Sequence, residues 1–189
     1  MTLEKLRKAV LKNVFHIGEV EKIFWDEPVQ TVRTQLSRFA RKGLVKKIKR
    51  GWYCFDDKKI DEMDLSARLY QPSYISLETA LNYYGLIPDV YQGVTGITVT
   101  ATKKIVTSFG TFYYTKISPK LFWGYTKVKS SADGTFFNMA KKEKAVLDYF
   151  YIRKIKNIDG TRLNLGDIDR RLYGEYAKRF PPWVGKINI

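Results

Sequence analysis

The chain of 189 residues has one cysteine, one histidine and no long apolar run. The lone Cys54 excludes an intramolecular disulfide and a cysteine-based zinc cage. The lone His16 excludes a histidine-rich metal site, and nothing around it resembles a nucleophile motif, so a structural or phosphate-contacting role is favoured. No glycine-rich phosphate loop is present either. We therefore expect no catalytic residue, no metal, no cofactor and no enzymatic activity.

Membrane segments are also missing from the sequence. No stretch approaches the ~20 apolar residues of a membrane span, and Met1 leads directly into an amphipathic segment without the apolar core of a signal peptide. We expect a soluble cytoplasmic protein that has no membrane partner.

Acidic side chains are absent from one long segment. Val29 to Phe55 carries eight lysines and arginines and not one aspartate or glutamate. The net charge of the chain is +15; residues 1–55 hold 13 basic and 5 acidic side chains, and residues 56–189 hold 21 and 14. A field of this sign attracts polyanions, and the neutralised phosphates release counterions, so binding should depend on salt. The charge favours nucleic acid as a partner, with an acidic protein as the alternative.

The same segment has the pattern of a winged helix-turn-helix. Thr2 is a candidate N-cap for a first helix. A third helix should have Asp26 or Glu27 near its cap and Pro28 in its first turn, and should end before Gly43. Residues 45–55 then read as a hairpin that turns at Gly51. The apolar positions expected in the three helices are Leu3, Leu6, Val10 and Leu11; Ile17, Val20, Ile23 and Phe24; and Val32, Leu36, Phe39 and Ala40.

The DNA-contacting residues follow from this pattern. The apolar positions of the third helix span roughly 100° of arc, and the polar and basic residues lie opposite them or on their flanks. We expect DNA contacts from Gln30, Thr31, Arg33, Thr34, Ser37, Arg38, Arg41 and Lys42 on the helix, and from Lys46, Lys47, Lys49 and Arg50 on the hairpin.

An α+β organisation with two domains is predicted for the whole chain. Residues 1–57 form the winged helix, and residues 65–189 form a small mixed α/β domain with a C-terminal helix. Residues 58–64 lie in the acidic stretch Asp56 to Asp64 and form a linker or short linking helix. The second domain should begin with a helix from Ser76 to Gly85, followed by strands at 97–100, 105–107 and 112–116. A helix is then expected at 139–152, with Lys141, Lys142 and Lys144 exposed, and a loop at 154–164. A last helix capped by Asp167 should point Ile168, Leu172, Tyr176 and Phe180 inward, before an extended tail that follows Pro181 and Pro182.

Sequence features typical of other functions are weaker than those typical of DNA binding. Pro88-Asp89 with the later Ala101-Thr102-Lys103 resembles a metal-dependent nuclease site, but Ala101 stands where the second carboxylate should be. Glu143 and Asp148 diverge by about 140° on a helix, so we expect each to pair with a neighbouring cation. The aromatic residues Phe112, Tyr113, Tyr114, Phe122, Trp123 and Tyr125 favour core packing over base stacking.

Three stretches carry a family resemblance. They are Lys42-Gly43-Leu44 together with Lys49-Arg50-Gly51-Trp52-Tyr53, then Tyr74 to Leu81 with Tyr84-Gly85-Leu86-Ile87, and finally Ala140 to Asp148. In this order, over residues 15–152, the chain resembles the AbiEi-like antitoxins of bacterial abortive-infection toxin–antitoxin pairs, which act in phage defence.

The resemblance implies a partner and a role. It implies an N-terminal winged helix that binds double-stranded DNA at inverted repeats in its own promoter and represses the operon, and a C-terminal domain needed for antitoxicity. The usual partner is a nucleotidyltransferase-like toxin, and an inverted-repeat operator favours two protomers per site. A stand-alone transcriptional regulator, a protein-interaction module and a degenerate nuclease are the alternatives. No role is predicted for residues 153–189.

Overall fold

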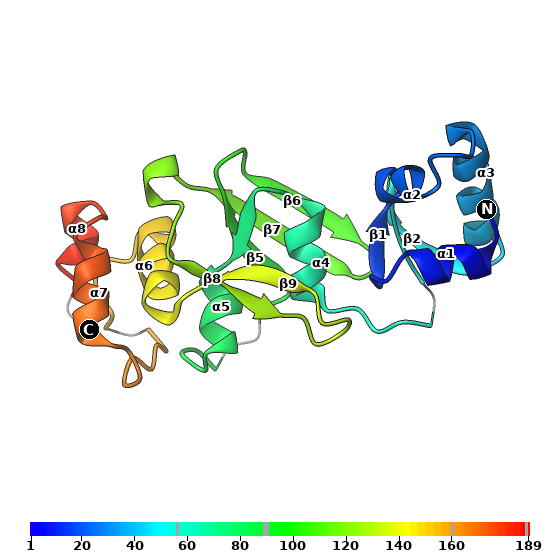
Figure 1. Ribbon diagram of the computed structural model, residues 1–189. Helices are drawn as coiled ribbons and strands as arrows, with labels where there is room; N and C mark the ends of the chain where they lie inside the picture. The colour runs from blue at the N-terminus through cyan, green and yellow to red at the C-terminus, as the bar shows by residue number, and fades with distance from the viewer. Residues whose placement is uncertain (56, 89–90, 160, 188) are drawn as a thin grey trace. The chain divides into compact units, whose positions relative to one another are not determined.

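The computed structural model describes residues 1–55, 57–88, 91–159, 161–187 and 189. Within them the chain is mixed α/β, with eight α-helices, one short 3-10 helix and two β-sheets (Figure 1). Contacts divide it into two compact units. The first comprises Met1–Asp61 with Thr107–Phe109 and Ser130–Thr135, and the second comprises Glu62–Val106, Gly110–Lys129 and Phe136–Ile189.

The first unit packs three helices with a three-stranded antiparallel sheet of order β1-β3-β2. The predicted helices and hairpin are present, but the short strand β1 was not predicted, because three residues are too few to show a period. The elements of the first unit are α1 (Leu3–Ala9), β1 (Val14–His16), α2 (Ile17–Ile23), α3 (Val29–Arg41), β2 (Val45–Lys49) and β3 (Trp52–Phe55).

The core of the first unit joins all three helices to the sheet. It contains Leu6 of α1, Phe15 of β1, Val20 of α2 and Val32 and Leu36 of α3, each fully buried. These side chains hold α3 against the rest of the unit, because burying a leucine or valine contributes roughly 1.5–3 kcal/mol.

Two predicted core positions are wrong. Leu11 is 87% exposed and Ile23 is 40% exposed. Helix α1 ends at Ala9, so the helical period on which Leu11 was placed no longer applies there, and Ile23 is the last residue of α2.

The two ends of α3 differ in how well the sequence predicted them. Pro28 is the N-cap, one residue before the first turn in which it was predicted, and no side chain caps the helix. Asp26 and Glu27 directly precede Pro28, so they lie near the cap as predicted. At the other end, Gly43 has a φ of +70° and its N–H donates to the carbonyl of Ala40 at 3.1 Å. This left-handed glycine ends the helix as predicted.

The second unit is built on a six-stranded mixed sheet of order β6-β7-β5-β4-β9-β8. Strand β5 runs parallel to β7 and β4 parallel to β9, whereas β4–β5 and β8–β9 are antiparallel. The strands are β4 (Ser73–Ile75), β5 (Val94–Thr98), β6 (Lys103–Thr107), β7 (Gly110–Lys116), β8 (Tyr125–Lys129) and β9 (Phe136–Ala140).

Helices cover the centre of this sheet. Helix α4 packs against β4, β5 and β9, and α5 packs against β5 and α6. Strands β4 and β5 are consequently buried along their whole length. The helices are α4 (Glu62–Leu69), α5 (Leu77–Tyr83), η1 (Pro119–Leu121), α6 (Lys142–Arg153), α7 (Arg170–Ala177) and α8 (Pro182–Gly185).

One predicted boundary in this unit needs correction. The division between units falls at Asp61, and α4 begins at Glu62, within the residues 58–64 for which a linker or short linking helix is predicted. Met139 belongs to β9, where it pairs with Ile75, so the predicted helix at 139–152 begins three residues too early. Pairing between distant strands decides these residues, and a local period cannot reveal it.

The C-terminal part departs further from the prediction. Asp169 caps α7 by accepting from the N–H of Leu172 at 3.0 Å, so the prediction of Asp167 as the cap is wrong. Pro182 starts the short helix α8 where an extended tail was predicted, because proline fits the first turn of a helix as well as it ends one. The predicted loop at 154–164 has no helix or strand among its described residues.

Candidate functional site

Helix α3 buries one side and exposes the other. Val32 and Leu36 are fully buried, and Phe39 and Ala40 pack partly against the same core. The opposite side therefore faces outward, as the helical period predicts. Of the predicted contact residues on this helix, Gln30, Thr31, Arg33, Ser37, Arg38, Arg41 and Lys42 are exposed and Thr34 is half-buried.

The exposed arginines of α3 differ in whether they already form an ion pair. Arg33 donates from Nε to Glu21 of α2 at 2.7 Å, so it is committed to a contact between helices. Within the part of the chain that the structure describes, neither Arg38 nor Arg41 has a side-chain hydrogen bond or ion pair. Arg38 and Arg41 are therefore better placed than Arg33 to contact a ligand.

The β2–β3 hairpin carries the second group of predicted residues. Lys46, Lys47 and Arg50 are exposed, and Lys49 is half-buried. The pairing of β2 with β3 shifts between Lys47 and Lys49, and a local irregularity of this kind redirects neighbouring side chains. The hairpin thus presents cations on the same unit as the exposed side of α3.

His16 supports this hairpin, a role that composition alone could not specify. Its Nδ1 accepts from the N–H of Gly18 at 3.1 Å, and Glu19 accepts from the N–H of His16 at 3.0 Å, forming a capping box at the start of α2. A side chain at Gly51 would meet the His16 ring, since an added Cβ would lie 2.7 Å from Nε2. The hairpin turn therefore requires glycine for space as well as for its φ of +81°.

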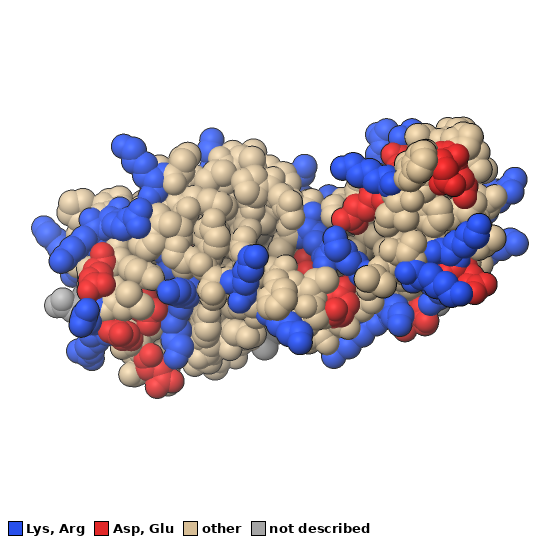
Figure 2. All heavy atoms as spheres, in the orientation of Figure 1, with Lys and Arg blue, Asp and Glu red and all other residues tan. Residues whose placement is uncertain are grey.

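Charge on the visible face of the first unit is predominantly basic. Figure 2 shows lysine and arginine side chains over the surface formed by α1 to α3, with fewer carboxylates between them. The described carboxylates of this unit include several that are already paired, such as Glu4 with Lys8 and Glu19 with Lys12. Surface pairs of this kind contribute little to stability, so their loss would cost little when a polyanion approaches.

A buried polar network lies inside the second unit. Lys144 and Asp148 are both fully buried and form an ion pair, so the prediction of an exposed Lys144 is wrong. Tyr74 and Ser76 each donate a hydroxyl to Asp148 at 2.9 Å. Ser76 precedes α5 but makes no side-chain cap, since its hydroxyl is used in this network.

The ammonium of Lys144 is also surrounded by aromatic rings. It lies 5.3 Å from the ring centroids of Tyr74 and Trp123 and 5.1 Å from that of Phe180. Burial lowers the pKa of Lys144 and raises the pKa of Asp148, and the charge of each partner opposes the shift of the other. The network uses its charges internally, which indicates a structural role.

Two stretches of the family resemblance meet in this network. Tyr74 and Ser76 belong to the stretch 74–81, and Lys144 and Asp148 to the stretch 140–148. These stretches therefore serve the core of the second unit, whereas the hairpin stretch lies in the first unit.

The remaining predicted chemistry has little structural support. Asp89, the first residue of the nuclease pattern, lies outside the described residues. Phe112 and Tyr114 are buried, which confirms the core interpretation for them.

Within residues 1–55, 57–88, 91–159, 161–187 and 189, no group of three or more His, Cys, Asp or Glu side chains is suited to hold a metal ion. No helix in these ranges is long and apolar enough to cross a membrane.

Comparison with known proteins leaves the function open. No protein-family model matches the chain, and no curated protein matches it with significance. Functional assignment therefore depends on the residues and their arrangement.

Proposed function

We propose that the protein binds double-stranded DNA through its first unit, used as a winged helix-turn-helix. The observation that supports this most directly is the outward side of α3, where Arg38 and Arg41 are exposed and unpaired within the described chain, on the same unit as a basic hairpin. The sequence from Val29 to Phe55, which contains α3 and the hairpin, has no carboxylate side chain. A helix backed by a buried stripe and followed by a cationic hairpin is suited to contact a groove and the adjacent backbone.

In the proposed complex, helix α3 and the hairpin contact different parts of the DNA. Helix α3 enters the major groove, where Arg38 or Arg41 pairs bidentately with guanine and Gln30 with adenine. Lys46, Lys47 and Arg50 of the hairpin bind phosphate or the minor groove and supply affinity that does not depend on base sequence.

The biological role we propose is that of a cytoplasmic, non-enzymatic antitoxin that represses its own operon. This part is supported by the three stretches that resemble AbiEi-like antitoxins. The partner would be a nucleotidyltransferase-like toxin encoded beside it, and two protomers would bind an inverted-repeat operator. Co-expression with the neighbouring gene, scored as rescue of growth, tests the antitoxin role separately from DNA binding.

A mobility-shift experiment tests the DNA-binding proposal. The purified protein is titrated onto the ~200 base pairs upstream of its own gene at ~150 mM salt, with a scrambled fragment of equal length as competitor. The proposal predicts retention of the upstream fragment at protein concentrations at least tenfold below those that retain the scrambled one. Equal retention of both fragments would reduce the first unit to a nonspecific basic surface.

A further inference from the structure

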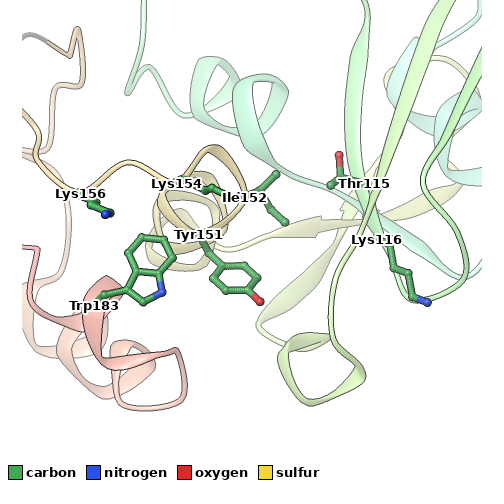
Figure 3. A pocket seen from close by; sticks show the side chains of 7 residues that line it. All are labelled: Thr115, Lys116, Tyr151, Ile152, Lys154, Lys156 and Trp183. Atoms are coloured by element: carbon green, nitrogen blue, oxygen red, sulfur yellow. The ribbon is translucent and has the colours of Figure 1, made fainter.

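The second unit contains a cavity of about 640 Å³ that the proposed function does not use. Residues of β7, α6, the segment after α6 and α8 line it (Figure 3). Its lining consists of Thr115, Lys116, Tyr151, Ile152, Lys154, Lys156 and Trp183. This volume lies within the range of small-molecule sites, ~300–1,000 Å³.

Two aromatic rings form one side of the cavity. Tyr151 and Trp183 stack with ring centroids 6.1 Å apart and an interplanar angle of 24°, and Figure 3 shows the two rings side by side. Both side chains are half-buried. Neighbouring flat rings that remain open on a cavity offer a surface on which another planar π system can stack.

The described residues that line the cavity carry charge of one sign only. Within the described chain, Lys116, Lys154 and Lys156 line the cavity, no acidic residue does, and none of the three lysines has an ion pair. Like charges gathered without a counter-charge repel one another, and an anion that binds among them relieves this repulsion. Several negative charges on one ligand suit three ammonium groups better than a single carboxylate does.

The cationic lining continues beyond this cavity. A smaller cavity of about 200 Å³ shares Thr115 with it and is lined by Lys103, Lys104 and Arg153, with no acidic residue among the described residues that line it. Arg153 is paired with Glu78 at 2.7 Å, so the two lysines supply the available charge there. A ligand longer than one nucleotide would find further cations in this direction.

We propose that the Tyr151–Trp183 cavity binds a nucleotide, with its base stacked on the aromatic side and its phosphates among Lys116, Lys154 and Lys156. A free nucleotide and one residue of a single-stranded nucleic acid share this chemistry. The site is independent of duplex binding by α3 and the hairpin, since it belongs entirely to the second unit. An acidic peptide would satisfy the lysines but would leave the stacked rings without a planar partner.

Binding to the full-length protein tests this proposal. Binding of ATP, GTP, CTP and UTP is measured by calorimetric titration. Binding of fluorescein-labelled single-stranded RNA hexamers of mixed sequence is measured by fluorescence anisotropy. We expect Trp183→Ala to weaken binding about tenfold or more, because base–aromatic stacking contributes substantially to such complexes. The double variant K154Q/K156Q, which keeps both rings, should weaken binding by a similar factor.

Matched variants locate the binding. The control K127Q/K129Q removes two exposed lysines from β8, outside both cavities, and should bind like wild type. The variant K46Q/K47Q, in the first unit, should also retain binding of the free nucleotides. Circular dichroism verifies that each variant is folded.

The outcomes separate the two sources of ligand. If free nucleotides bind and the cavity variants weaken this binding, the cavity is a small-molecule site. If only the RNA hexamers bind and the cavity variants weaken this binding, the cavity is a single-strand site. The proposal is overturned if neither probe binds, or if K154Q/K156Q and K127Q/K129Q bind equally well.

Discussion

Two basic features, one in each unit, have opposite environments. In the first unit, Arg38 and Arg41 stand exposed on α3 with no partner in the described chain. In the second unit, Lys144 is fully buried, paired with Asp148 and surrounded by aromatic rings. The first arrangement leaves charge available to a ligand, whereas the second uses charge to organise a core. Net charge alone therefore does not locate a binding surface.

The largest expected effect concerns the buried pair. Asp148→Ala should lower the free energy of unfolding by about 3–5 kcal/mol, since it leaves the ammonium of Lys144 buried without its counter-charge. Urea unfolding of the full chain measures this loss. Lys141→Ala, at the exposed start of the same helix, should change the free energy of unfolding by less than ~0.5 kcal/mol.

A double variant sharpens that result. Lys144→Met with Asp148→Leu should lose less stability than the sum of Lys144→Met and Asp148→Leu measured singly, because no unpaired charge remains. Losses that simply add would show that the pair is not coupled and would remove the contrast between the two units.

The hairpin turn provides the next largest effect. Gly51→Ala should lower the free energy of unfolding by about 2–3 kcal/mol, because alanine disfavours the left-handed conformation and its Cβ would approach His16. Gly43→Ala is the matched control, since Gly43 has a similar φ of +70° but nothing within 4 Å of an added Cβ. We expect a loss of about 1 kcal/mol there. Equal losses would contradict a supporting role for His16.

Base reading and phosphate binding should separate in the DNA affinity. Arg38→Ala or Arg41→Ala should weaken specific binding by ~1–3 kcal/mol if the residue reads a base, whereas Lys47→Ala should mainly reduce the salt slope by about one. Anisotropy titrations on upstream and random duplexes at several salt concentrations measure both quantities. An equal loss on random DNA for all three variants would refute the base-reading assignment.

The smallest effect is a gain in stability at the cavity. Lys154 has a φ of +55°, a conformation that glycine adopts at lower cost at the end of a helix. Lys154→Gly should therefore raise the free energy of unfolding by about 0.5–1 kcal/mol. Thermal unfolding measures this gain, and Lys156→Gly, placed after the helix, should not reproduce it.

The sequence predicted the first unit better than the second, for a physical reason. In α3 the inward Val32 and Leu36, the terminal Gly43 and the hairpin at Gly51 are local patterns, and each was recognised. In the second unit, Met139 is a strand residue because it pairs with Ile75. No local period contains that information.

The functional side chains follow the same division. The exposure of Arg38 and Arg41 came from helical spacing, but the ion pair of Arg33 with Glu21 requires two helices in contact. Lys144 was misplaced because lysine is rarely buried, and its burial depends on Asp148 and on the rings of Tyr74, Trp123 and Phe180, which folding brings together. The cavity lined by Tyr151 and Trp183 likewise joins residues that are distant in sequence.

The most direct test of the central claim is to compare two double variants on the upstream DNA fragment. R38A/R41A removes the two arginines of α3 that have no partner in the described chain. K127A/K129A removes two exposed lysines from the second unit, with the same change in net charge. We predict that, at ~150 mM salt, R38A/R41A loses the preference for the upstream fragment over a scrambled one, while K127A/K129A keeps it. Retention of the preference by R38A/R41A would contradict the assignment of DNA recognition to α3.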